Sequence, residues 1–221
     1  LPTWARRNVT VIGQGIEIER FSADGTTDSW RARLSASPAS PLVIAVGRTD
    51  PEKALHVAIE AVAAVRAAGV DAHLALIGGP GKDDGTYLAE LEELAAQRLP
   101  GAFRVEPAVA DVAPLMRSAD VLVSTSTEEP FGLVILEAQA CGLPVVSSAS
   151  GGPLDFVTDC ETGLLVPPGD PAATAVAIRR LLEDPDLVAA VKANARVLVE
   201  RCFTAQIRAQ RISDMYTKVL S

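Results

Sequence analysis

Residues 42–53, LVIAVGRTDPEK, run from an apolar segment into a predicted helix start and give the strongest indication of the fold class. Residues 42–47 form a continuous apolar run, as expected of a parallel strand that is covered on both faces. Asp50 and Pro51 then supply an N-cap and a proline at the first helical position, which predicts a helix to about Ala68. These residues therefore indicate the first strand and helix of a βαβ unit.

The same alternation of short apolar runs and amphipathic segments continues along the chain. Further strands are expected at residues 72–78, 102–106, 121–125, 144–148 and 163–166. Helices are expected between them at residues 85–98, 112–118, 131–141 and 153–158, and three consecutive helices follow at 171–183, 186–201 and 204–220. The predicted fold class is α/β, a Rossmann-like doubly wound parallel sheet of about six strands with C-terminal helices.

Residues 1–40 differ in kind from the rest and are expected to form a hinge segment, while residues 41–221 form the domain. Within the hinge segment, residues 9–12 predict a short strand and the polar stretch 22–29 indicates a linker. The chain begins at Leu1 rather than at a methionine, so we expect it to be part of a longer protein.

The composition of the 221 residues limits the classes of protein that fit. With 48% hydrophobic and 22% charged residues, the chain has the balance of a soluble globular protein. A net charge of −8 argues against nucleic-acid binding through a broad basic face. The three cysteines are widely spaced, which disfavours disulfides and fits a reducing cytoplasm. The longest uncharged run is broken by glycines and prolines, so no membrane span is expected.

Two cations near the start of the predicted helix suggest an anionic ligand. Lys53 would lie in the first turn of the helix, where the helix dipole disfavours a cation, and Arg48 directly follows the strand. Ligands of open α/β sheets bind at the carboxyl ends of strands, so a phosphate or diphosphate between these cations would explain both. The alternative is that Lys53 pairs with Glu52 or Asp50 on a solvated turn.

Two glutamates accompany the apolar helix predicted at residues 131–141. Glu137 is the only charged residue within 130–154, and a carboxylate in an apolar helix needs a partner. Two adjacent ribose hydroxyls would be one such partner, and a buried ion pair would be another. Glu129 precedes the helix at the ligand edge, where Gly132 lets the backbone approach a ligand; the alternative is that Glu129 only stabilises the helix N-terminus.

Together these features resemble the E-x7-E signature of retaining glycosyltransferases of the GT-B fold, specifically family 4. The signature here is EPFGLVILE, from Glu129 to Glu137. Further matching segments lie in the family's order at residues 46–53, 118–121, 138–146, 151–152 and 162–170. Residues 14–17 are similar to the turn that begins the C-terminal domain in this family. The resemblance covers about residues 9–220 and implies the donor-binding half, with the acceptor-binding N-terminal domain absent from this chain.

The resemblance also implies three catalytic residues that act on a nucleotide-diphosphate sugar. Arg48 and Lys53 would hold the diphosphate and stabilise the departing nucleotide, because negative charge grows on that oxygen in the transition state. Glu129 would contact the donor sugar beside its anomeric carbon, and Glu137 would bind the ribose hydroxyls. In the front-face mechanism of the family, the donor phosphate helps to deprotonate the acceptor.

Other donor contacts are implied at the backbone and at the base. The start of the signature helix, at Phe131, Gly132 and Leu133, would add backbone amides to the phosphate site. Val109, within residues 108–111, lies where the family recognises the base.

The chain departs from the family pattern at three positions. A glycine is usual where Pro107 and Ala54 stand, and a glutamate is common where Asp155 stands. Because of Pro107, the geometry of the base-binding loop cannot be carried over from the family. None of these three positions lies within the E-x7-E signature.

Three other patterns receive a structural interpretation. Residues 78–81 contain glycines after a strand but lack the third glycine of a dinucleotide fingerprint, so a turn is expected. Asp184 and Asp186 match the spacing of a metal-binding D-x-D motif, but they lie between two predicted helices, where a capping role is expected. His56 and His73 are single histidines for which packing is expected, and no metal site is predicted.

We therefore expect the donor-binding domain of a retaining, metal-independent glycosyltransferase without a cofactor beyond its nucleotide-diphosphate sugar. Its partner would be the acceptor domain, and no nucleic-acid partner is expected. The protein would be located in the cytoplasm. The isolated domain would show little catalytic turnover. The resemblance leaves room for peripheral membrane association through that other half. The alternatives are half of a nucleotide-sugar 2-epimerase, or a non-catalytic module that binds a nucleotide sugar.

Overall fold

A six-stranded parallel sheet forms the centre of the protein, whose computed structural model describes residues 9–27, 30–34, 37, 39–82 and 85–220. The strands are β1 (Leu42–Val46), β2 (His73–Ile77), β3 (Phe103–Glu106), β4 (Val121–Ser124), β5 (Val145–Ser148) and β6 (Leu164–Val166). Their order is β3-β2-β1-β4-β5-β6, and every neighbouring pair is parallel. The order reverses between β1 and β4, which is the topological switch point of a doubly wound sheet.

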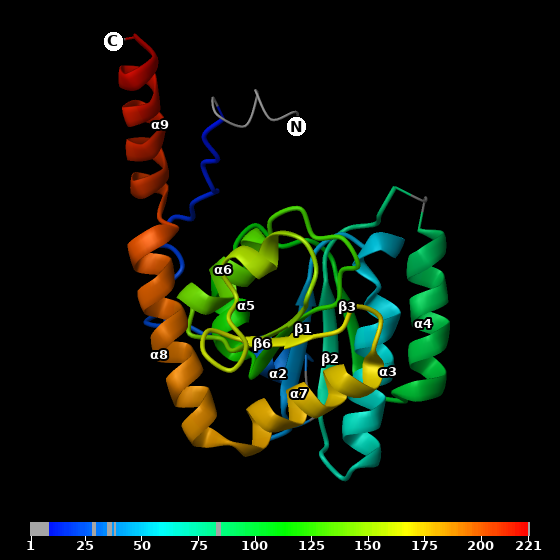
Figure 1. Ribbon diagram of the computed structural model, residues 1–221. Helices are drawn as coiled ribbons and strands as arrows, with labels where there is room; N and C mark the ends of the chain where they lie inside the picture. Colours follow the sequence, from blue (N-terminus) through cyan, green and yellow to red (C-terminus); the bar gives the residue numbers. More distant parts are fainter. Residues whose placement is uncertain (1–8, 28–29, 35–36, 38, 83–84, 221) are drawn as a thin grey trace.

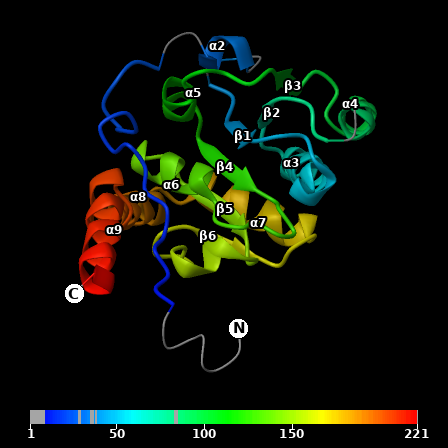
Figure 2. The same ribbon diagram turned by 90° about the horizontal axis from the view of Figure 1, so that it is seen from above.

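Helices cover both faces of the sheet, as the view from above shows (Figure 2). They are α2 (Trp30–Leu34), α3 (Leu55–Ala67), α4 (Thr86–Arg98), α5 (Ala113–Ser118), α6 (Leu133–Ala140), α7 (Pro171–Glu183), α8 (Pro185–Cys202) and α9 (Ala205–Leu220). One face carries α3, α4 and α7, and the other carries α2, α5, α6 and α8. In Figure 1, α9 extends beyond the body of the domain, and none of its residues is buried.

The central strand β1 shows why continuous apolar runs predicted the sheet correctly. Val43 and Ala45 pack into the hydrophobic cluster on one face, while Leu42 and Ile44 pack into the cluster on the other. A strand that is covered on both faces needs apolar side chains at every position rather than at alternate ones. The predicted fold class, a Rossmann-like α/β sheet of six strands, is confirmed.

The helix predicted from Pro51 is wrong in its first turn. Residues 51–53 form a separate 3-10 turn, Ala54 adopts left-handed torsion angles of φ = 46° and ψ = 41°, and α3 begins only at Leu55. Asp50 makes no capping hydrogen bond through its side chain. Lys53 therefore precedes the helix rather than lying within its first turn.

Two other predicted helices are shorter than expected. The signature helix begins at Leu133 instead of Phe131, because Gly132 takes a φ of 94° that ends the preceding loop. In place of a helix at residues 153–158, the chain forms a 3-10 turn at Gly152–Asp155. Both changes leave more of the backbone after Glu129 in loops at the carboxyl edge of the sheet.

The hinge segment packs on the domain without forming the predicted strand at residues 9–12. Instead, Ile16 forms a single parallel bridge with Thr204, and its N–H donates to the Phe203 carbonyl at 2.9 Å. The short helix α2 was not predicted, and residues 28–29 of the expected linker lie outside the described residues. The division between a hinge segment and the domain stays a prediction.

Candidate functional site

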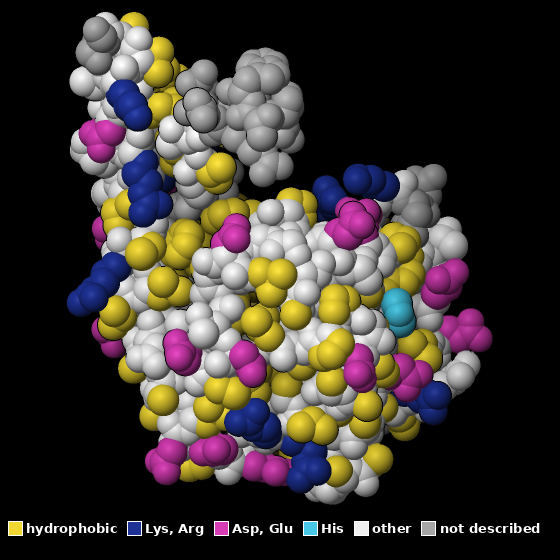
Figure 3. Space-filling view, in the orientation of Figure 1, with side chains coloured by type: hydrophobic (Ala, Val, Ile, Leu, Met, Phe, Trp, Pro, Cys, Tyr) yellow, Lys and Arg dark blue, Asp and Glu magenta, His cyan; other side chains and the backbone are white. Residues whose placement is uncertain are grey.

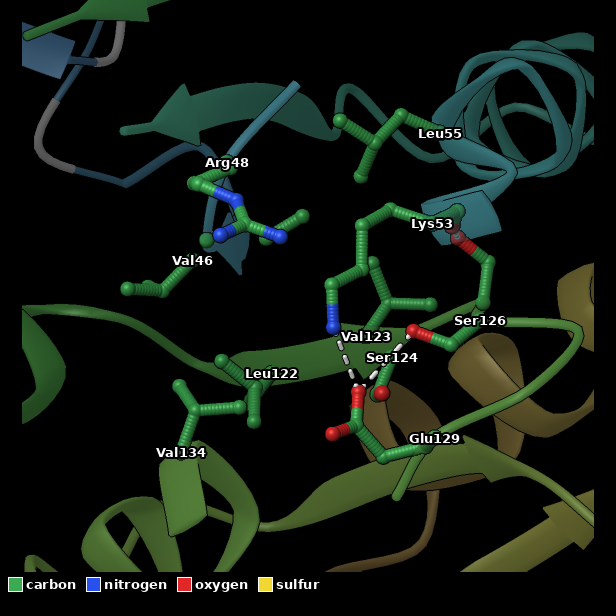
Figure 4. A pocket seen from close by; sticks show the side chains of 13 residues that line it. Val46, Arg48, Lys53, Leu55, Leu122, Val123, Ser124, Ser126, Glu129 and Val134 are labelled. Atoms are coloured by element: carbon green, nitrogen blue, oxygen red, sulfur yellow. Dashed lines mark hydrogen bonds and ion pairs between the residues drawn. The ribbon is translucent and has the colours of Figure 1, made fainter. Parts of the chain in front are cut away.

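Three adjoining cavities open at the carboxyl ends of β1 and β4, at the switch point of the sheet. All three are lined by Arg48, Lys53 and Glu129. The innermost lies over the ends of the two strands, and Figure 4 shows the side chains that surround it. The largest has a volume of about 690 Å³, within the range of pockets that bind small molecules. The carboxyl edge of the sheet thus has room for a small-molecule ligand.

Lys53 and Glu129 point toward each other across the inner cavity (Figure 4). Lys53 Nζ donates to Glu129 Oε2 at 2.7 Å, and Ser126 Oγ donates to the same oxygen at 3.1 Å. The two charged side chains are only 24% and 12% exposed, so their interaction is less screened than a surface ion pair. Lys53 does not pair with Glu52 or Asp50, which excludes the solvated-turn alternative for this side chain.

The local backbone fixes this pair from both sides. Thr125 Oγ1 donates to the Lys53 carbonyl at 2.8 Å, which ties the 3-10 turn after β1 to the end of β4. Gly152 N–H donates to the Glu129 carbonyl at 2.8 Å. A Cβ at Gly151 would lie 2.2 Å from that carbonyl oxygen, and one at Gly152 would lie 2.4 Å from the Phe131 Cα. The paired glycines therefore allow the signature loop to rest on this turn.

Arg48 extends into the cavity from the end of β1 (Figure 4). Its Nε donates to Asp50 Oδ2 at 2.7 Å, and its Nη2 lies 2.7 Å from the same oxygen. The Arg48 side chain is 56% exposed, while that of Asp50 is 2% exposed. The Lys82 backbone N–H and the Arg48 guanidinium hold the pKa of Asp50 below its usual range. From the sequence, Asp50 was expected only as a cap, so this contact was missed.

Of the other residues predicted to contact the donor through the signature, three line a cavity and one does not. Phe131, Gly132 and Leu133 line one of the three cavities with Lys53, so the start of α6 lies beside the cations. Glu137, one helical turn beyond Leu133, lines none of the three cavities.

The side chain of Glu137 is half-buried, and its carboxylate has no hydrogen bond or ion pair with any residue in the described part of the chain. Burial raises the pKa of Glu137 from 4.5 to about 7, and the positive charge of Arg20 opposes this rise. A buried structural ion pair, the alternative from the sequence, therefore does not form among these residues. A partly buried carboxyl group whose pKa is raised is a candidate member of a functional site.

Arg20 links the hinge segment to the loop predicted to recognise the base. Its Nη2 donates to the Ala110 carbonyl at 2.7 Å, and its Nε donates to Asp111 Oδ1 at 3.1 Å. Val109, in the same loop, packs against the hydrophobic cluster that α6 shares. No sequence pattern singles out Arg20, because its contacts lie about 90 residues away along the chain.

Asp184 and the two histidines have the structural roles expected of them. Asp184 Oδ1 accepts a hydrogen bond from the Leu187 backbone at 3.0 Å and caps α8. His56 Nδ1 contacts the Tyr87 hydroxyl at 2.9 Å, and His73 is buried in β2. Within the residues that the structure describes, no group of three or more His, Cys, Asp or Glu side chains could hold a metal ion. The same residues include no helix with the length and apolar character that crossing a membrane requires.

The fold and the three cavities together define a Rossmann-like α/β domain with a candidate site, lined by two cations and a carboxylate, at the switch point. The chain belongs to the family of glycosyl transferases group 1, whose model matches residues 26–198. This confirms the resemblance at the level of a group 1 glycosyltransferase domain.

Relatives agree with this membership. D-inositol 3-phosphate glycosyltransferase from Thermobispora bispora is 33% identical over 219 residues, which are 96% of this chain and 51% of that protein. The protein of the same description from Salinispora arenicola is 38% identical over 202 residues, 85% of this chain and 45% of that protein. The chain therefore spans about half the length of the curated relatives it matches.

Solved structures show the same fold. Anabaena HepE in complex with UDP-glucose superposes with a TM-score of 0.85 at 27% identity, over 95% of this chain and 57% of that chain. The C-terminal domain of the group 1 glycosyl transferase LpcC from Francisella tularensis has a TM-score of 0.74 at 25% identity, over 86% of this chain and 100% of that chain. The fold matches the C-terminal domains of GT-B glycosyltransferases.

Proposed function

We propose that this chain is the donor-binding domain of a retaining, family 4 glycosyltransferase that transfers a sugar from a nucleotide-diphosphate sugar without a metal ion. The observation that carries the proposal is the convergence of Arg48, Lys53 and Glu129 on the three cavities at the switch point. HepE, a structural neighbour, was solved with UDP-glucose, which supports a ligand of this class. Because the relatives are about twice as long, acceptor binding is assigned to a further domain.

The diphosphate would lie between the two cations and the start of α6. Arg48 and Lys53 carry positive charge at one cavity, and the first backbone amides of α6, near Leu133, add a favourable dipole. As the bond to the sugar breaks, negative charge builds on the leaving phosphate oxygen, and fixed cations stabilise that charge without rearranging. Fixed protein cations can thus serve the role that a divalent metal serves elsewhere.

Glu129 would act on the sugar. Lys53 and Ser126 both bind its Oε2, while its Oε1 has no hydrogen-bond partner among the described residues. When the diphosphate takes over Lys53, the carboxylate becomes free to bind a sugar hydroxyl and to face the positive charge that develops at the anomeric carbon. The acceptor hydroxyl would attack the anomeric carbon from the same face that the leaving group departs from, so the anomeric configuration is retained. The leaving phosphate would receive the proton of the acceptor hydroxyl.

The nucleoside would extend along α6 toward the hinge segment. Leu133 and Glu137 are four residues apart, so the ribose would lie about 6 Å further along the helix axis than the phosphates. There the unpartnered Glu137 carboxylate would accept hydrogen bonds from two ribose hydroxyls. The base would meet the loop that contains Val109, which Arg20 holds in place.

Calorimetric titration of the chain with UDP, GDP and ADP tests the donor site. We expect at least one of them to bind, with affinity unchanged by EDTA and reduced in both Arg48→Ala and Lys53→Ala. Lys192→Ala, which removes a cation from the exposed face of α8, is the matched control and should bind as the unmodified chain does. Absence of binding by all three nucleotides, or undiminished binding in both site variants, would overturn the proposal. Retention is tested on the full-length enzyme by the anomeric configuration of its product.

A further inference from the structure

The buried carboxylate of Asp50 is next to the proposed diphosphate site, yet the proposed function gives it no role. It is 2% exposed, and both of its oxygens have partners. Oδ2 accepts from Arg48, and Oδ1 accepts from the Lys82 backbone N–H at 2.8 Å. Asp50 thus joins the arginine at the end of β1 to the loop that follows β2.

The loop after β2 is shaped to hold this carboxylate. A Cβ at Gly81 would lie 2.4 Å from Asp50 Oδ1 and 2.4 Å from the Thr49 carbonyl oxygen, so glycine is required for the two loops to meet. Thr49 N–H donates to the Gly79 carbonyl at 3.1 Å, and Thr49 and Pro80 form a parallel bridge. The two loops are therefore fastened together at the place where Asp50 meets Arg48.

A carboxylate at this position is unfavourable for anion binding by charge alone. It lies 2.7 Å from the guanidinium and offsets part of the attraction that Arg48 would exert on a phosphate. Asp50 can therefore favour anion binding only by fixing the position of the Arg48 side chain. Arg48 is more than half exposed, and a free arginine side chain loses conformational entropy when it is fixed. Glu52 cannot do the same, because its carboxylate is 3.8 Å away and half exposed.

The atoms that Asp50 occupies leave the rest of the guanidinium available. Asp50 engages Nε and Nη2, whereas Nη1 has no partner among the residues that are described. Both N–H groups of Nη1 can thus face the cavity, in a plane that the carboxylate sets.

We propose that Asp50 is a positioning residue of the diphosphate site, which holds the Arg48 guanidinium at the cavity and couples it to the loop after β2. This inference rests on the proposed function. Ordering of the arginine before the ligand arrives removes part of the entropic cost of binding. The loop after β2 thereby contributes to donor affinity without touching the donor.

A double-mutant cycle on UDP affinity tests this role. Asp50→Asn keeps the size of the side chain and an oxygen for the Lys82 N–H, but it removes the charge-assisted contact with Arg48. We expect Asp50→Asn to weaken UDP binding about 5- to 10-fold, which is less than the full contribution of one charged hydrogen bond because the site also becomes more positive. In an Arg48→Ala background, Asp50→Asn should change UDP affinity by less than about 2-fold. When Asp50→Asn is combined with Lys53→Ala, the fold-losses in UDP affinity of the two single variants should multiply.

Controls separate positioning from general damage. Asp71→Asn removes one negative charge from an exposed carboxylate that pairs with Arg66 away from the site, and should leave UDP affinity unchanged. If Asp50→Asn does not fold, Asp50→Ser serves as the second variant, because it removes the carboxylate without placing a Cβ against the Thr49 carbonyl, as Gly81→Ala would. Asp50→Ser should weaken UDP binding only while Arg48 is present.

The outcomes also distinguish this inference from the proposed function. If the unmodified chain binds UDP and Arg48→Ala weakens binding, then unchanged or tighter binding by Asp50→Asn would overturn the positioning role alone. An equal loss in the presence and absence of Arg48 would do the same, because it indicates a structural effect. A chain that binds no UDP would overturn the proposed function and this inference with it.

Discussion

Replacement of Glu137 by glutamine should make the ligand-free chain more stable at pH 8 and at the same time weaken nucleotide binding. The half-buried carboxylate has no hydrogen-bond partner among the described residues, and burial raises its pKa from 4.5 to about 7. The charged form is therefore disfavoured in the folded state relative to the unfolded chain. Glutamine has nearly the same shape but carries no charge at any pH.

The sign and size of the effect follow from proton linkage. Since the folded pKa is above the unfolded one, the folded state binds more protons between pH 4.5 and about 7, and stability falls as the pH rises through this window. Each pKa unit corresponds to about 1.4 kcal/mol, so the upper limit is about 3 kcal/mol. Solvent screening of a side chain that is only partly buried reduces this to about 1–2 kcal/mol.

Thermal unfolding at pH 5 and pH 8, with and without UDP, measures the effect. For a domain of this size, about 1–2 kcal/mol corresponds to a rise of about 3–6 °C in the Tm of Glu137→Gln at pH 8, and to little change at pH 5. UDP should stabilise the unmodified chain more than the variant, because ribose hydroxyls supply the partners that the carboxylate lacks. Glu93→Gln, on the exposed face of α4, is the matched control and should change neither quantity.

Two results would contradict the roles given to Glu137. Parallel pH profiles of Tm for the unmodified chain and Glu137→Gln would show that the carboxylate carries no cost of burial. Equal UDP affinity in the two proteins would show that Glu137 does not bind the ribose, even if the cost of burial is present.

Three further predictions concern the backbone and the thiols. Gly152→Ala, whose Cβ would meet the Phe131 Cα at 2.4 Å, should reduce UDP affinity and Tm together; unchanged calorimetric titrations would contradict the bracing role of this turn. Ala54→Gly should change the free energy of unfolding in urea by less than about 1 kcal/mol, whereas Ala54→Val should lose more than about 2 kcal/mol, because a β-branched residue is strained at φ = 46°. Burial raises the pKa of the Cys141 thiol to about 11, so iodoacetamide should alkylate Cys160 in the native protein and Cys141 only after unfolding, as peptide mass spectrometry would show.

The strands were predictable because their signal is local. A run such as residues 42–46 contains apolar side chains for both faces of the sheet, and no knowledge of the neighbours is needed to recognise it. The grouping of Arg48, Lys53 and Glu129 was also accessible, since the carboxyl ends of parallel strands meet at one edge.

What could not be predicted depends on contacts between distant segments. Asp50 and Pro51 form a good local signal for a helix start, but the loop after β2 binds the Asp50 carboxylate and Ala54 turns left-handed before the helix begins. The β-branched residues at 9–12 find no strand beside them in the described sheet. The contact of Arg20 with the 108–111 loop likewise has no counterpart in local sequence.

A crystal structure of this chain with UDP would test the proposed donor site at the carboxyl ends of β1 and β4. We predict that the diphosphate lies within hydrogen-bond distance of Arg48 and Lys53, that the Lys53–Glu129 contact is loosened or shared with the ligand, and that the ribose hydroxyls lie at Glu137. Binding of UDP away from the carboxyl ends of β1 and β4, or a diphosphate that leaves both cations uncontacted, would contradict this prediction.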